Sequence, residues 1–92
     1  MGDPIGVLHV DDDPDFAELA AEFIERHDAR IHVETANSAS EGLSHLSKTG
    51  VDCIVSDFEM PGQSGIEFLK TVRGGDTELP FILFTGKGSE EI

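Results

Sequence analysis

The stretch Val51–Gly65, VDCIVSDFEMPGQSG, contains the residue whose type and position are best suited to chemistry. A short apolar run ends in Asp57, and a Met-Pro-Gly turn follows before the next helix is expected to begin. A carboxylate at the carboxyl end of a buried strand is held rigidly, yet solvent and ligands can reach it. We therefore take Asp57 as the candidate reactive residue.

Two other acidic residues and a threonine follow apolar runs in the same way. Asp11 and Asp12 come directly after the run Ile5–Val10, and Thr85 comes directly after the last apolar run of the chain. In a parallel sheet, ligands bind at the edge where the carboxyl ends of the strands meet. We expect all three residues to meet Asp57 in one site.

Three carboxylates in one pocket repel each other, so the arrangement is costly unless a cation binds or some of the groups protonate. Mg²⁺ prefers oxygen ligands and keeps several waters, so two carboxylates and a backbone carbonyl would suffice to bind it. Asp57 would then be both a metal ligand and a nucleophile that forms an acyl phosphate. The Thr85 hydroxyl can hydrogen-bond a phosphoryl oxygen, and Gly86 beside it leaves room for a phosphodonor.

Strands and helices are expected to alternate along the chain and to position these residues. Apolar runs typical of buried strands span 5–10, 31–35, 52–56 and 80–84, with helical spacing of apolar residues between them. Helix starts are indicated by Asp13 with Pro14 and by the capping-box pairs Ser38/Glu41 and Ser64/Glu67. The order βαβαβαβ predicts an α/β fold with a doubly wound parallel sheet and helices on both faces.

Several side chains are expected to fill the core rather than to act in chemistry. Phe16, Phe23 and Phe68 lie on the apolar stripes of the predicted helices, and we expect all three to face the core. His9 lies inside the first strand and is expected to be a packed, hydrogen-bonded core histidine. Cys53 is expected to be a reduced core thiol.

The composition limits the class of function. The chain has 92 residues, so we expect one domain spanning 1–92. Nineteen acidic and six basic residues give a formal net charge of −13, which disfavours direct binding to nucleic acid or to an anionic membrane and is typical of halophilic proteins. A single cysteine excludes an intramolecular disulfide. Neither a signal peptide nor a membrane-spanning run is evident, so we expect a cytoplasmic protein.

Taken together, the motifs resemble the receiver domain of two-component response regulators. The acidic residues after the first strand, the run Asp57–Gly65 with its D-x-x-M-P-G-x-x-G pattern, and Thr85-Gly86 occur in that family's order and spacing across the whole chain. The resemblance implies a flavodoxin-like fold, with strand order 2-1-3-4 for the strands present. It also implies Mg²⁺ as cofactor and a histidine kinase or phosphotransfer protein as partner. A homodimer or an attached output domain would be a further partner.

The resemblance also implies a role for each residue of the site. Asp57 would accept the phosphoryl group, Asp12 would bind Mg²⁺ directly, and Asp11 would assist through water. The backbone carbonyl of Glu59 would be the third protein ligand. Thr85 would bind the phosphoryl group and move with it, which shifts an equilibrium between inactive and active conformations.

The family pattern continues with a fifth strand, which begins with a phosphoryl-binding lysine, and with a last helix. The 92 residues end before both, so we expect a receiver that is incomplete at its C-terminus. Lys87 is too close to Thr85 to be that lysine, and it stands at a position where the family tunes the lifetime of phosphorylation. We expect Glu59 and Lys87 to flank the mouth of the pocket, either as an ion pair that hinders attacking water or as two solvated side chains.

Two other functions are open at this point. A Mg²⁺-dependent aspartyl-phosphate phosphohydrolase would use the same nucleophile, although that class has a second aspartate two residues later, where this chain has Glu59. A receiver-like docking module would use the fold without phosphorylation. The leading interpretation is a phosphoacceptor receiver that is not an enzyme acting on a separate metabolite. It would catalyse only its own phosphorylation and dephosphorylation.

Overall fold

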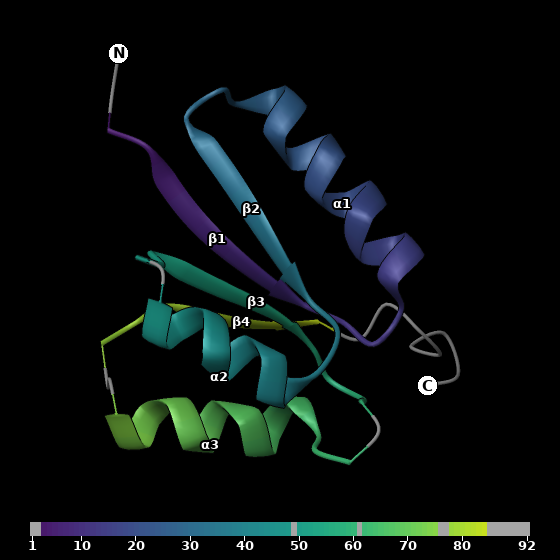
Figure 1. Ribbon diagram of the computed structural model, residues 1–92, viewed down its shortest axis with the longest axis vertical. Helices are drawn as coiled ribbons and strands as arrows, with labels where there is room; N and C mark the ends of the chain where they lie inside the picture. Colours follow the sequence, from purple (N-terminus) through teal and green to yellow (C-terminus); the bar gives the residue numbers. More distant parts are fainter. Residues whose placement is uncertain (1–2, 49, 61, 76–77, 85–92) are drawn as a thin grey trace.

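The computed structural model describes residues 3–48, 50–60, 62–75 and 78–84. These residues form strands and helices that alternate along the chain (Figure 1). The strands are β1 (Ile5–Val10), β2 (Ile31–Ala36), β3 (Cys53–Asp57) and β4 (Phe81–Phe84), and the helices are α1 (Pro14–His27), α2 (Ala39–Lys48) and α3 (Gly65–Gly75). Neighbouring strands pair in parallel in the order β2-β1-β3-β4. The predicted alternation and strand order are confirmed.

Capping residues begin α1 and α3 at the predicted positions. The Asp13 carboxylate accepts a hydrogen bond of 3.2 Å from the Phe16 N–H, and Pro14 is the first residue of α1. Ser64 and Glu67 form a reciprocal capping box, in which each side chain accepts a hydrogen bond of 3.2 Å from the other residue's N–H. These bonds satisfy N–H groups that a helix start leaves without a partner, so they determine where the loops after β1 and β3 end.

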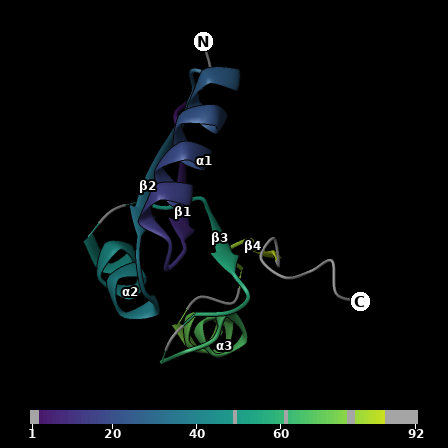
Figure 2. The same cartoon turned by 90° about the vertical axis from the view of Figure 1, so that its right-hand side faces the viewer.

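The main core lies between the sheet and the layer formed by α2 and α3. Leu8 and Val10 of β1 and Ile54 of β3 are fully buried in one cluster with Phe68 and Val72 of α3. Helix α1 covers the opposite face, over β1 and β2 (Figures 1 and 2). Helices therefore lie on both faces of the sheet, as the doubly wound prediction requires. None of these three described helices has the length and apolar character that crossing a bilayer demands.

Two aromatic residues of α1 are more exposed to solvent than the sequence predicts. Phe16 and Phe23, which we expected in the core, are 44% and 63% exposed, whereas Phe68 is buried as predicted. The side of α1 that faces the sheet carries the small residue Ala17, which is buried. The Phe16 ring instead extends sideways to Phe84 of β4, with 6.2 Å between the ring centroids.

The start of α3 is pressed against the backbone that follows β3. The Gly65 N–H donates a hydrogen bond of 2.8 Å to the Phe58 carbonyl. A Cβ on Gly65 would overlap the Asp57 carbonyl oxygen and would lie 2.7 Å from Leu83 Cδ2. In the preceding turn Gly62 has a φ of 84°, which favours glycine. Close packing at Gly65 therefore holds the chain directly behind Asp57.

We predict that Gly65→Ala destabilises the protein by about 1–3 kcal/mol, because the new methyl group collides with backbone that cannot move freely. Gly74→Ala in the same helix is the matched control, since a Cβ there meets nothing within 4 Å. It should leave stability unchanged or raise it by up to about 1 kcal/mol. Urea unfolding curves measure both effects, and equal stability of the two variants would contradict the role given to Gly65.

Candidate functional site

Asp57 is the last residue of β3, an interior strand between β1 and β4. The sequence predicts this strand at 52–56, whereas in the structure it ends one residue later. Asp57 therefore belongs to the strand itself rather than to the following loop. The residue is 1% exposed. The Glu59 N–H donates a hydrogen bond of 3.3 Å to Asp57 Oδ1, and the Phe58 N–H donates one of 2.8 Å to the Phe84 carbonyl. The strand and the turn together hold the carboxylate in place.

Asp11 and Asp12 begin the loop after β1, the strand beside β3. Asp11 is fully buried, and its N–H donates a hydrogen bond of 2.9 Å to the Ala36 carbonyl. Its Oδ1 accepts a hydrogen bond of 2.9 Å from the Asp13 N–H. The Asn37 side-chain amide donates to the Asp11 carbonyl at 3.4 Å. Asp12 is half-buried, so it lies closer to the surface of the site.

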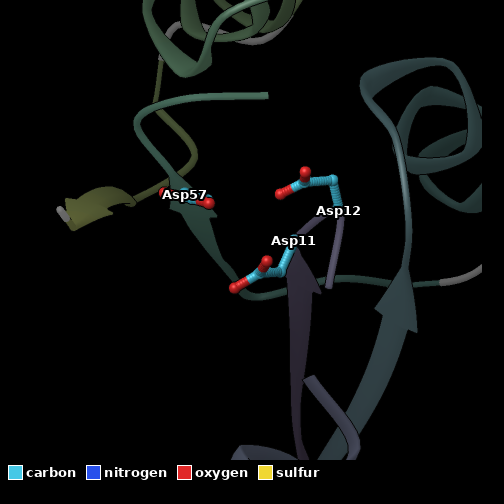
Figure 3. Close-up of side chains that lie close together, drawn as sticks. All are labelled: Asp11, Asp12 and Asp57. Carbon is cyan, nitrogen blue, oxygen red and sulfur yellow. The ribbon is translucent and has the colours of Figure 1, made fainter. Parts of the chain in front are cut away.

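The three carboxylates meet at the carboxyl edge of the sheet (Figure 3). One carboxylate oxygen from each of Asp11, Asp12 and Asp57 lies within 4.8 Å of the other two. In the close-up, the Asp12 and Asp57 side chains point toward one another across a gap, with Asp11 beside it. Three acidic groups this close in a largely buried site repel one another, and a bound cation would offset that repulsion.

The ligand atoms of this cluster suit a hard divalent cation. They are all carboxylate oxygens, which suit Mg²⁺ better than metals that prefer nitrogen or sulfur ligands. Two oxygens bound to the same Mg²⁺ ion stand about 3–4 Å apart. The carboxylate oxygens all lie within 4.8 Å of one another, so they could share one such ion, either directly or through bound water.

His9 lies on β1 two residues before Asp11, and it is 3% exposed. Its Nε2 atom is 3.8 Å from Asp11 Oδ2. Burial lowers the pKa of His9, and the adjacent Asp11 carboxylate opposes that shift. The predicted packing is confirmed, because the ring packs edge-on against Phe16 and Phe84. The predicted hydrogen bond is wrong: within the described ranges neither ring nitrogen has one, because the neighbouring acceptor, Asp11 Oδ2, stands 3.8 Å from Nε2, beyond hydrogen-bond length.

The remaining predicted site residues fall into two groups. Glu59 is exposed at the start of the turn after Asp57. Thr85, Gly86 and Lys87 lie outside the described residues. Their roles stay predictions.

Sequence reasoning missed two contacts made to Asp11. Asp11 directly follows β1 and lies two residues after His9, a spacing that puts two side chains on one face of an extended chain, so the sequence does contain this signal. Asn37 follows β2, and the pairing of Val10 with Ala36 is what brings its amide next to the Asp11 carbonyl. That register follows from packing along the whole of β1 and β2, so no local pattern identifies Asn37.

Known proteins resemble this chain along nearly its whole length. A family model described as the response regulator receiver domain matches residues 7–92. The C4-dicarboxylate transport transcriptional regulatory protein DctD of Rhizobium meliloti is 34% identical over 82 residues. The probable transcriptional regulatory protein TcrX of Mycobacterium tuberculosis is 31% identical over 90 residues. These matches cover 89% and 98% of this chain, but only 17% and 38% of the two relatives.

Solved structures show the same architecture. The response regulator TrrA of Thermotoga maritima, solved in complex with Mg²⁺–BeF, matches with a TM-score of 0.83 at 29% identity, over 95% of this chain and 74% of that one. TrrA in complex with the histidine kinase ThkA matches with a TM-score of 0.82 at 28% identity, over 96% of this chain and 74% of that one. The predicted flavodoxin-like fold is confirmed.

We predict that Mg²⁺ stabilises the protein through the acidic cluster. Saturation at 100 times the dissociation constant adds about 2.7 kcal/mol to the free energy of unfolding. Asp12→Asn should lose most of this gain because it removes a charged ligand. Asp13→Asn should keep it, because asparagine caps a helix as well as aspartate does. Thermal unfolding in EDTA and in MgCl₂ measures the gain, and an equal gain in all three proteins would contradict the assignment.

Proposed function

The chain belongs to the response regulator receiver domain family, and we propose that it accepts a phosphoryl group on Asp57 from a histidine kinase in a Mg²⁺-dependent step. One observation carries the proposal: Asp57 ends an interior strand and has oxygens of Asp11 and Asp12 within 4.8 Å of its own. Transfer of a phosphoryl group to a carboxylate needs mainly positioning and neutralisation of charge. This edge of the sheet offers a rigid nucleophile beside candidate cation ligands.

The proposed nucleophile is a carboxylate oxygen of Asp57. It attacks the phosphorus of a phosphohistidine, and the P–N bond breaks as the new P–O bond forms. The imidazole of the donor leaves with the electron pair, and Asp57 becomes an acyl phosphate. The Glu59 N–H bond to Oδ1 supports this role because it restricts the orientation of the carboxylate. Bound Mg²⁺ would neutralise the negative charge of the carboxylates and of the incoming phosphoryl group.

We propose different roles for the two aspartates of the β1 loop. Asp12 is half-buried and would bind the cation directly, whereas Asp11 would act through water. The Oδ1 atom of Asp11 is already engaged by the Asp13 N–H, which supports the indirect role. The Glu59 carbonyl and a carboxylate oxygen of Asp57 would complete the protein ligands.

Thr85 and Gly86 are proposed to serve the phosphoryl group itself. The Thr85 hydroxyl would donate a hydrogen bond to a phosphoryl oxygen, and Gly86 would leave room for the phosphodonor. Phe84 immediately precedes them in the sequence and pairs with Asp57 in the register of β3 and β4, which supports both roles.

The proposed partner is a histidine kinase or a phosphotransfer protein. The similar protein TrrA was solved with the histidine kinase ThkA, which supports this choice. DctD and TcrX, which are named transcriptional regulatory proteins, are much longer than this chain. We propose that the whole protein signals through an attached output region or a homodimer. A net charge of −13 makes direct binding of nucleic acid by these 92 residues unfavourable.

We predict that the wild-type protein gains one phosphoryl group when it is incubated with acetyl phosphate and Mg²⁺. Asp57→Asn should gain none, because it lacks the nucleophilic oxygen. Asp15→Asn is the matched control: it removes an exposed carboxylate from the first turn of α1 and should react like wild type. Omitting Mg²⁺ should slow the reaction at least about tenfold. Intact-protein mass spectrometry measures the modification.

Other outcomes would assign other functions. Mg²⁺-dependent turnover of a phosphate ester would support an aspartyl-phosphate phosphohydrolase. Absence of modification, even with a phosphorylated histidine kinase, would contradict the phosphoacceptor role and support a docking module.

We also propose that Glu59 and Lys87 form an ion pair that slows the attack of water on phosphorylated Asp57. The exposure of Glu59 beside Asp57 supports it. Lys87→Ala should then shorten the lifetime of the phosphorylated protein about two- to fivefold, the range expected from one exposed ion pair. Lys70→Ala, on the exposed side of α3, is the control. Loss of the phosphoryl group is followed over time, and an unchanged lifetime would mean that both side chains are simply solvated.

A further inference from the structure

His9 is a buried polar residue that the proposed phosphoryl chemistry does not use. It is 3% exposed, and in the part of the chain that the structure describes neither ring nitrogen has a hydrogen-bond partner. Burying such a group without a partner destabilises the folded state. The other residues of β1 are aliphatic or glycine, and a residue of that kind at this position would avoid the cost. The penalty is offset if the ring contributes to the site beside it.

The Asp11 carboxylate lies next to this ring. The distance from His9 Nε2 to Asp11 Oδ2 is 3.8 Å, and the other oxygen of Asp11 accepts the Asp13 N–H. Side chains two residues apart on a strand project from the same face, so the ring approaches the carboxylate along β1. A movement of about 1 Å would bring the two atoms to the usual hydrogen-bond length of about 2.9 Å.

Two phenylalanine rings restrict the orientation of the imidazole. Phe16 of α1 meets it at 6.1 Å with an interplanar angle of 81°, and Phe84 of β4 meets it at 5.5 Å with an angle of 88°. Edge-to-face contacts of this kind favour one ring orientation over others. Phe84 also pairs with Asp57 in the register of β3 and β4. One of the two rings that restrict the His9 imidazole therefore comes from a strand that borders the site.

We propose that His9 is a positioning residue for metal binding, and that its Nε2–H group donates a hydrogen bond to Asp11 Oδ2 when the cation binds. The inference rests on the proposed function, because it requires that Asp11 takes part in binding Mg²⁺. Because Asp11 is proposed to act through water, the donor would fix the carboxylate that orients this water, and loss of such an outer-shell contact typically lowers metal affinity about 10- to 100-fold. Nε2 carries a proton in one neutral tautomer and in the imidazolium ion, so the contact does not require a charged ring.

The dissociation constant of Mg²⁺ for the full chain, measured by isothermal titration calorimetry, tests this role. His9→Leu and His9→Met replace the donor with an apolar side chain, and both should raise the dissociation constant about tenfold or more. His9→Gln places an amide N–H near the position of Nε2 and should restore the constant to within about threefold of wild type. Thr35→Val is the matched control, since Thr35 pairs with His9 in the neighbouring strand. It should leave the constant unchanged.

The outcomes separate the role of His9 from the proposed metal site. If wild type binds Mg²⁺ and the two apolar variants bind it equally well, His9 is not a positioning residue and the metal site stands. If the glutamine variant is as weak as the apolar variants, the ring acts only through packing and the proposed hydrogen bond is refuted. If wild type itself binds no Mg²⁺ at millimolar concentration, both the metal site and the role of His9 are refuted. Circular dichroism identifies any variant that fails to fold. If one of the two apolar variants is unfolded, the dissociation constant of the other one decides whether His9 is a positioning residue.

Discussion

The adjacency of β1 and β3 in a parallel sheet is the constraint on which the rest of this site depends. Asp57 ends β3 and Asp11 follows β1, so the pairing of the strands brings two almost fully buried carboxylates together. On the face of the sheet covered by α2 and α3, the same two strands are held in register by the core residues Leu8, Val10 and Ile54. The carboxylates therefore cannot separate to relieve their repulsion without disrupting the core of the protein.

The range of electrostatic forces explains why a divalent cation, rather than ordinary salt, is expected to relieve this repulsion. The carboxylate oxygens lie within 4.8 Å of one another. The Debye length at 0.1 M salt is about 10 Å, so dissolved ions screen the overall net charge more effectively than they screen this cluster. High salt would thus act on the charge of the acidic surface, whereas Mg²⁺ would act on the carboxylate cluster at the carboxyl edge of the sheet.

The two faces of the sheet contribute differently to the same edge. On the face covered by α2 and α3, close packing at Gly65 holds the backbone behind Asp57. On the face covered by α1, His9 lies between aromatic rings and beside Asp11. One face thus restrains the proposed nucleophile through its backbone, and the other places the proposed side-chain donor beside a neighbouring carboxylate. Rigidity from both sides suits a reaction that depends on positioning.

The sequence by itself determined the element types, the caps and the set of acidic residues at the strand ends. Alternating apolar runs, the Asp13 cap and the Ser64–Glu67 pair depend on neighbours close in the chain, so local chemistry specifies them. The meeting of Asp11 with Asp57 was also predictable, because parallel strands place their carboxyl ends at one edge.

Only the tertiary structure decided which side of α1 faces the sheet and what surrounds His9. Helical spacing defines apolar stripes, but the choice between neighbouring stripes depends on how closely the helix can approach its partner. In α1, Ala17 is buried while Phe16 and Phe23 are exposed. The surroundings of His9 come from α1, β1 and β4, which are distant in the sequence. Their contacts arise from packing between elements, and no local pattern encodes them.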